Sequence, residues 1–242
     1  METEEILDSA VVTVVYDNLA YGEAFATSHG FACVVDTQGA ERESTILFDT
    51  GGDFSILAEN ITLAGRQFSE FDIVVISHNH WDHTGGLEGV LQRKPYVPVY
   101  LPEPSMADDI SDKFPLENPV FGEPDPHRLA YGVWTTGVVE NRKDEQGLVL
   151  STAKGLAVIT GCAHPGIVRM VETVERHFGK NVFLVLGGFH KPPKGSAKKL
   201  QNMGVEYAAP SHCTGEESTA AIKRAFDDGF LYSGVGRSVR IQ

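Results

Sequence analysis

Three histidines and one aspartate lie within six residues of one short segment, ISHNHWDHTGG at 76–86. Imidazole and carboxylate groups suit a borderline cation such as zinc. Because side chains alternate along an extended strand, His78 and His80 point to one side, and we expect Asp82 and His83 to face a second point beside it. A four-residue tetrahedral shell needs ligands from elsewhere, so this segment predicts only part of a metal site.

Further histidines follow apolar runs later in the chain. His164 stands in ITGCAHPG, His190 in VLGGFH and His212 in APSHCTG, each near glycine or proline. A single histidine is usually a satisfied core or surface residue, but the joint pattern favours a shared metal site. His29 lacks such company, and we do not expect it at the site.

The elements that must position these residues are short apolar strands and amphipathic helices. Strands are expected at 11–16, 30–36, 44–50, 71–77, 147–152, 155–161, 181–188 and 205–210. Helices are expected at 54–63, 167–178 and 218–226. We expect the third helix to open at Thr214, whose spacing to Glu217 is typical of a capping box. The order of elements predicts an α/β fold with two sheets and helices outside.

Length and composition favour one soluble domain over 1–242. A chain of 242 residues with 42% hydrophobic residues can bury a full core. The net charge of −13 argues against nucleic acid and anionic membranes as partners. No run approaches the roughly 18–20 apolar residues of a membrane span, and the acidic start METEEILDSA is unlike a secretion signal.

The cysteines indicate the compartment in which the protein works. There are three, widely spaced, which is typical of reduced thiols rather than a disulfide framework. We therefore expect a cytoplasmic protein. The oligomeric state is not indicated by the sequence.

A proline-rich segment at about 94–131 interrupts the regular pattern, with PYVPVYLPEPS, FPLENP and GEPDPH. A loop this long is usually functional, so we expect an insertion that folds over the active site. An ordered surface excursion is the alternative.

The motif HNHWDH matches the H-x-H-x-D-H signature of the metallo-β-lactamase superfamily, and His164 and His212 follow in the expected order. With FDTGG, GCAHPG, LGGFH and PSHCTG, the chain resembles the branch related to the 7,8-dihydropterin-6-methyl-4-(β-D-ribofuranosyl)aminobenzene-5′-phosphate synthase of methanopterin biosynthesis. This resemblance implies an αββα sandwich of two mixed β-sheets flanked by helices, with a two-metal site at the sheet edges. The first metal would be bound by His78, His80 and His164, and the second by Asp82, His83 and His212. Zn²⁺ is the expected ion, in one or both sites, with Mn²⁺, Mg²⁺ or Fe²⁺ as alternatives.

The chain departs from the superfamily at GGFH, residues 187–190, where most members carry a bridging aspartate. The missing carboxylate leaves the site one negative charge poorer, which predicts a weaker second metal and a preference for anionic ligands. We expect His190 to act as an acid or to hold a phosphate, because histidine serves both purposes near neutral pH. A ligand role for His190 is the alternative.

Three residues next to these motifs are expected to support the site. Asp49 in LFDTGG should accept the second N–H of a ligand histidine, with capping of the following helix as the alternative. Cys162 and Cys213 flank His164 and His212. Thiolates bind zinc well, but the histidines suffice, so we expect these cysteines to pack beside the site.

Candidate substrate contacts lie close to the same motifs. Lys191 and Lys194 belong to KPPKGSAKK at 191–199, a basic stretch in an acidic protein. We expect them to meet a phosphate, with a solvated turn as the alternative. Trp81 and Phe189 are candidates for stacking on a flat ring.

Together these residues predict a metal-dependent enzyme acting on a small anionic, phosphate-containing substrate. Zinc lowers the pKa of bound water to about 7, which makes hydroxide available at neutral pH. In a hydrolase, Asp82 would orient that hydroxide; in a synthase-like transferase, the metals would hold a departing diphosphate. Both reactions use the same ligands, so both stay open. A metal- or ligand-binding sensor without turnover is the alternative.

Overall fold

Two β-sheets pack face to face in the computed structural model, which describes residues 5–40, 42–111 and 118–242. The first sheet has the order β13-β1-β2-β3-β4-β5-β6 and consists of β1 (Ser9–Tyr16), β2 (Ala32–Gly39), β3 (Arg42–Phe48), β4 (Ile73–Val75), β5 (Val99–Leu101), β6 (Pro119–Phe121) and β13 (Ser238–Ile241). The second has the order β12-β11-β10-β9-β8-β7 and consists of β7 (Arg128–Ala130), β8 (Val133–Thr135), β9 (Leu148–Thr152), β10 (Gly155–Thr160), β11 (Val182–Gly188) and β12 (Tyr207–Ser211).

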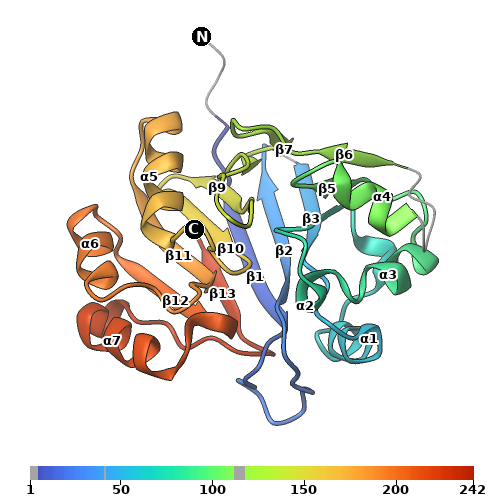
Figure 1. Cartoon of the computed structure of the whole chain (residues 1–242), viewed down its shortest axis with the longest axis horizontal. Helices are drawn as coiled ribbons and strands as arrows, with labels where there is room; N and C mark the ends of the chain where they lie inside the picture. The colour runs from blue at the N-terminus through green and yellow to red at the C-terminus, as the bar shows by residue number, and fades with distance from the viewer. Residues whose placement is uncertain (1–4, 41, 112–117) are drawn as a thin grey trace.

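Both sheets are mixed, and helices cover their outer faces (Figure 1). The first sheet is covered by α1 (Phe54–Leu63), α2 (Trp81–Thr84), α3 (Leu87–Arg93) and α4 (Ser105–Ser111). The second is covered by α5 (Ile167–Phe178), α6 (Ser196–Asn202) and α7 (Glu216–Phe226). The described residues also form the 3₁₀ turns η1 (Phe68–Glu70), η2 (His212–Thr214) and η3 (Asp227–Gly229). The α/β class and the αββα sandwich are therefore confirmed.

The apolar side chains form three layers, which explains why the sandwich is stable. One cluster fills the space between the sheets and includes Phe31, Val75 and Leu186. The second joins the first sheet to its helices, and the third joins the other sheet to α5, α6 and α7. Strands β4 and β11 are buried along their whole length, as expected of apolar strands covered on both faces. Removal of this surface from water is the main force that holds the layers together.

The third predicted helix begins differently from the expectation. α7 starts at Glu216, and Gly215 occupies the position before it with φ 79°. Thr214 lies in η2, where its hydroxyl donates to the Ser211 carbonyl at 2.7 Å and accepts from the Phe189 amide at 3.0 Å. The predicted capping box is therefore wrong, because Gly215 precedes α7 and the Thr214 hydroxyl is already bonded to Ser211 and Phe189. Helices α1 and α5 have the predicted bounds.

The described part of the proline-rich segment 94–131 forms three short strands and one helix. β5 and β6 extend the first sheet, β7 ends the second, and α4 lies between β5 and β6 (Figure 1). Residues 112–117 of the predicted insertion lie outside the described residues. Within the described ranges, no helix has the length and apolar character required to cross a membrane.

Gly187 of β11 pairs with Thr160 of β10 and has φ 118°. A Cβ atom there would lie 2.0 Å from the Thr160 carbonyl oxygen. We expect Gly187→Ala to lower the free energy of unfolding by more than about 1–3 kcal/mol, because the clash adds to the strained backbone. Urea denaturation measures this loss. Gly179→Ala is the matched control, since Gly179 has φ 64° but nothing within 4 Å of the added Cβ; equal losses in the two variants would contradict the clash.

Candidate metal centre

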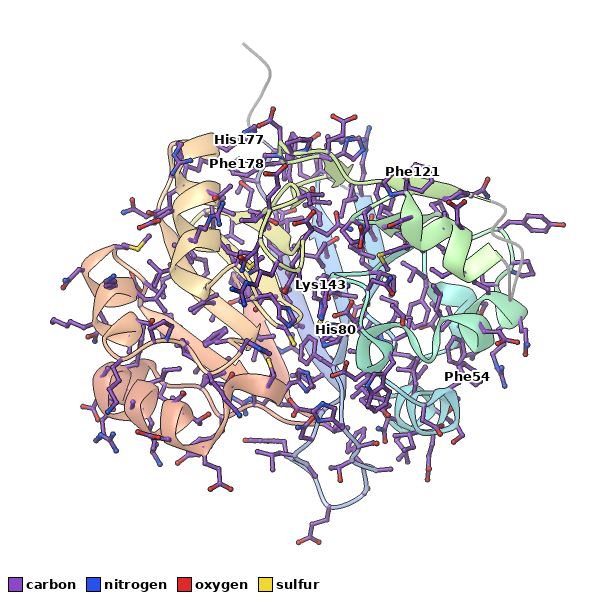
Figure 2. All side chains as sticks on the ribbon, viewed as in Figure 1. Phe54, His80, Phe121, Lys143, His177 and Phe178 are labelled. Atoms are coloured by element: carbon purple, nitrogen blue, oxygen red, sulfur yellow. The ribbon has the colours of Figure 1, made fainter. Side chains whose placement is uncertain are left out.

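The predicted site residues gather at one edge of the sandwich, where the carboxyl ends of parallel strands meet. β3 and β4 are parallel in the first sheet, and β10, β11 and β12 are parallel in the second. The loops that follow these strands therefore converge, and sites in α/β proteins form at such carboxyl ends. Figure 2 shows His80 at the centre of the view, between the half that carries α1 to α4 and the half that carries α5 to α7.

His78, His80 and His164 form the first cluster, with ring nitrogens that all lie within 4.8 Å of one another. Nε2 of His78 is 2.9 Å from Nδ1 of His80. Two imidazoles on one tetrahedral zinc, with bonds of about 2.0–2.1 Å, hold their nitrogens about 3.3 Å apart. Nε2 of His164 is buried and makes no hydrogen bond to the described residues. Such an atom is rare in a folded protein unless a ligand satisfies it, so this cluster fits a metal ion.

The second cluster surrounds the Asp82 carboxylate. Its Oδ2 lies 3.2 Å from His29 Nε2, 3.3 Å from His212 Nε2 and 3.7 Å from His83 Nε2. The predicted residues Asp82, His83 and His212 are therefore neighbours. The structure adds His29, which the sequence reasoning excluded. The signal that could have found it is the His-Gly pair directly before a predicted strand.

The outer nitrogen of four cluster histidines is bonded to a protein oxygen, which turns the other nitrogen inward. The Nδ1 contacts are His78 with Ser77 Oγ at 2.8 Å, His83 with Asp49 Oδ2 at 2.7 Å, His164 with Glu145 Oε2 at 2.9 Å and His212 with Asn18 Oδ1 at 2.9 Å. Asp49 is fully buried and also accepts from the amide and hydroxyl of Ser77. The residue that caps α1 is Asp53. Asp49 thus holds one histidine of the site in place.

Glu145 is a buried carboxylate that the sequence reasoning missed. It accepts the amides of Cys162, Ala163 and His164 at 2.7–2.8 Å, as well as His164 Nδ1. Burial alone would raise its pKa, but His164 and the backbone donors outweigh burial and lower the pKa below its ordinary value. One side chain therefore fixes the whole loop that presents His164. An acid directly before an apolar strand, as in KDEQGLVL, was the available signal.

The protonation states at the site suit a metal. Burial and the neighbouring imidazoles hold the pKa of His78 well below its ordinary value, and burial lowers the pKa of His212 to about 4. Burial opposes ionisation of Asp82, but contacts with His212 and His83 keep the pKa of this carboxyl low. For buried His83, the Asp49 carboxylate outweighs burial and raises the pKa. Three of these four groups therefore stand at neutral pH in the form that a metal ion requires.

Backbone strain is concentrated in the loops of the site. Asp49, Ala163, His190 and His212 have positive φ values of 58°, 55°, 44° and 47°. Non-glycine residues rarely adopt this conformation, and each costs on the order of 1–3 kcal/mol. Such strain persists where the surrounding contacts fix it, as those of Asp49 and of the Glu145-bound loop do.

A pocket of about 520 Å³ opens over both clusters. Among the predicted substrate contacts, Trp81 and Lys191 line it, and Trp81 is 63% exposed. Lys194 instead lines a neighbouring hollow of about 250 Å³, which Lys191 also borders. Phe189 is only 1% exposed and packs in the core under α5 and α7, so its burial fits a packing role rather than stacking on a substrate.

The segment 94–131, His190 and Lys143 differ in their position relative to this pocket. No described residue of 94–131 lines it, so the expected position of that segment over the site gains no support from these residues. His190 lines the pocket, and its ring centroid lies 4.3 Å from that of His164. Lys143, which sequence reasoning did not single out, lies beside His80 in Figure 2, and its charge contributes to lowering the pKa of His80 after burial and His164.

Comparisons with known proteins agree with this architecture. Residues 34–168, more than half of the chain, match the model of the metallo-β-lactamase superfamily. A 7,8-dihydropterin-6-methyl-4-(β-D-ribofuranosyl)-aminobenzene-5′-phosphate synthase from Methanocaldococcus jannaschii is 27% identical over 95% of this chain and 96% of its own length. An uncharacterised protein of the same organism is 26% identical over 96% of this chain and all of its own.

Among solved structures, Tm1679, described as a metal-dependent hydrolase of the β-lactamase superfamily, aligns with a TM-score of 0.77 and 25% identity. The alignment covers 96% of this chain and 99% of that one. The fold, the order of the histidine motifs and the family match lead to one conclusion: this chain belongs to the metallo-β-lactamase superfamily.

Proposed function

We propose that this protein is a metal-dependent enzyme that acts on a small, phosphate-containing anion bound in the pocket over the two clusters. The observation that supports this proposal best is the convergence of several imidazoles and one carboxylate on an open pocket. A purely structural histidine cluster has no need of an exposed pocket above it. Lys191 lines the pocket and Lys143 acts on the pKa of His80, so positive charge lies near the site although the whole chain carries −13.

Under this proposal the first cluster, His78, His80 and His164, holds one ion, and Asp82, His83 and His212 hold a second. Bound zinc would supply Lewis-acid stabilisation of charge on a phosphoryl or carbonyl oxygen. The protein's own part is to fix these ligands through Asp49 and Glu145, and to place cations where a phosphate would lie. His29 holds Asp82 from the open side of the pocket. His190 is the side chain best placed to exchange a proton with a substrate, since it lines the pocket without belonging to either cluster.

The first candidate reaction is a transfer that joins a dihydropterin methyl carbon to an aminobenzene ribosyl phosphate. The support is the relative of that name, which matches nearly the whole chain. The new bond would form between the methyl carbon and the amino nitrogen, a diphosphate would leave from that carbon, and the nitrogen would lose a proton. Hydrolysis is the second candidate, because the structural relative at 25% identity is described as a metal-dependent hydrolase.

The test is to assay the zinc- or manganese-loaded protein with three substrates: a dihydropterin methyl diphosphate together with the aminobenzene phosphate, a phosphodiester, and a lactone. We expect release of diphosphate with the first. Turnover of the phosphodiester or lactone alone would favour the hydrolase. Metal binding with no turnover on any of the three would instead favour the sensor that the sequence left open.

Replacement of His190 separates a chemical role from a ligand role. We expect His190→Ala to keep its metal and to lose about 10²–10⁴-fold in kcat, the usual contribution of a positioned acid or base. The two readouts are metal content by mass spectrometry and turnover of the substrate identified above. His177→Ala, at an exposed position in the last turn of α5, is the control and should retain both. Loss of metal from His190→Ala would show that His190 is a ligand.

A further inference from the structure

The buried thiol of Cys162 lies between the two histidine clusters. Its Sγ is 3.3 Å from Nε2 of His83. It also lies within 4.8 Å of the ring nitrogens of both His78 and His83. One of these histidines belongs to the first predicted metal shell and the other to the second. The sulfur is therefore within reach of both shells.

The distance between Cys162 Sγ and His83 Nε2 fits two ligands of one metal ion. A thiolate at about 2.3 Å and an imidazole at about 2.0–2.1 Å from one tetrahedral zinc lie about 3.5 Å apart. The observed separation of 3.3 Å is close to this value. Nδ1 of His83 is already bonded to Asp49, so Nε2 is the nitrogen left to bind an ion. This nitrogen is the one that contacts Cys162 Sγ.

The space beside Cys162 has no room for an additional carboxylate at the end of β11. A Cβ atom on Gly188 would lie 2.3 Å from the Gly161 carbonyl oxygen and 2.8 Å from Cys213 Sγ. Asp49 and Glu145, two buried acids of the site, already accept hydrogen bonds from histidines and amides, and buried Asp17 accepts the amide of His212. The Cys162 sulfur, by contrast, lies within 4.8 Å of a ring nitrogen of His78 and of one of His83.

Cys213 is less suited to this role than Cys162. Its Sγ accepts the backbone amide of His190 at 3.3 Å and lies 3.7 Å from the Cys162 carbonyl oxygen. The ligand atoms of Cys213 and His190 lie within 4.8 Å of Cys162 Sγ, but this group of donor atoms does not include His78 or His83. Cys213 therefore serves as a matched control for a cysteine in the same environment.

We propose that Cys162 is a metal ligand of this centre, binding as a thiolate together with His83 in the position between the two shells. The inference rests on the metal centre proposed above. On binding, the sulfur–hydrogen bond breaks, the sulfur–metal bond forms and the proton passes to solvent. Coordination to a cation deprotonates a thiol outright, which overcomes the effect of burial.

The experiment is to titrate Co²⁺ into the metal-free protein and to compare it with Cys162→Ser and Cys213→Ser. We expect a near-ultraviolet sulfur-to-cobalt charge-transfer band in the wild type and in Cys213→Ser, and its loss in Cys162→Ser. We also expect the Cys162→Ser variant to bind zinc more than about 10-fold more weakly, as measured by competition with a chelator. X-ray absorption of the zinc-loaded wild type should show a sulfur neighbour at about 2.3 Å, and this measurement needs no variant to fold.

The possible failures are distinguishable. A wild type that binds cobalt without the band, and zinc without a sulfur neighbour, would overturn the role of Cys162 and leave the metal centre intact. A band that persists in Cys162→Ser and disappears in Cys213→Ser would overturn it in favour of the other thiol. A wild type that binds no metal at all would overturn both this inference and the proposed function.

Discussion

Replacing His80 with alanine is expected to remove the metal of the first cluster and to lower kcat/KM by more than about 100-fold. His80 contributes Nδ1, which lies 2.9 Å from Nε2 of His78, and the loss of a ligand should cost more than the roughly 10–100-fold typical of residues that only support ligands. His80 is only partly buried, whereas His78 is fully buried. Alanine at position 80 should therefore leave the packing of the hydrophobic core unchanged. Metal content and turnover should therefore fall without loss of the fold.

The measurements are metal content by mass spectrometry, kcat/KM, and a thermal unfolding curve for the metal-free protein. His177→Ala is the control, because His177 is an exposed histidine in the last turn of α5. It should keep wild-type metal content and activity. If His80→Ala retained both ions and full activity, the assignment of the first cluster would have to be abandoned.

Replacing Glu145 with alanine is expected to destabilise the protein by about 3–5 kcal/mol, the cost of breaking a buried charged network. The variant would leave the buried amides of Cys162 and Ala163 without their acceptor, and each unsatisfied group costs about 1–3 kcal/mol. It would also free the His164 ring, so metal affinity should fall by about 10–100-fold. Glu145→Gln keeps the shape and one acceptor oxygen, and we expect an intermediate loss.

Urea denaturation at several pH values tests the role of this carboxylate. Because the folded-state pKa of Glu145 lies below its ordinary value of 4.5, its contribution to stability is fully present above that value and is lost as the pH falls through the folded-state pKa. The difference between wild type and Glu145→Gln should therefore shrink in acid. Glu140→Gln, at an exposed position in the same connection, is the control. Equal stabilities of the Glu140 and Glu145 variants at pH 7 would contradict the role given to Glu145.

The sequence by itself determined the features that depend on local pattern. Apolar periodicity located the long strands and gave α1 and α5 their bounds, because burial of one face requires that spacing. The spacing of HNHWDH placed His78 and His80 on one side of an extended segment, and the strand-end positions of His164 and His212 indicated that they converge. Three-residue strands such as β5 and β6 carry too few residues for a periodic signal, and they were missed.

Only the tertiary structure decided which side chains support the centre. His29 reaches Asp82 from the loop after β1, Asn18 orients His212 across 194 positions of sequence, and Glu145 binds the loop of His164. None of these pairs has a local spacing. Asn18 and His212 come from loops of the two different sheets, whereas His29 with Asp82, and Glu145 with His164, join two loops of the same sheet. The contact of the Phe189 amide with the Thr214 hydroxyl, and the approach of Cys162 to His83, likewise join residues far apart in the sequence. Local sequence motifs identify the residues that could bind a metal. The contacts that orient those residues form only when the strands hold the loops in place.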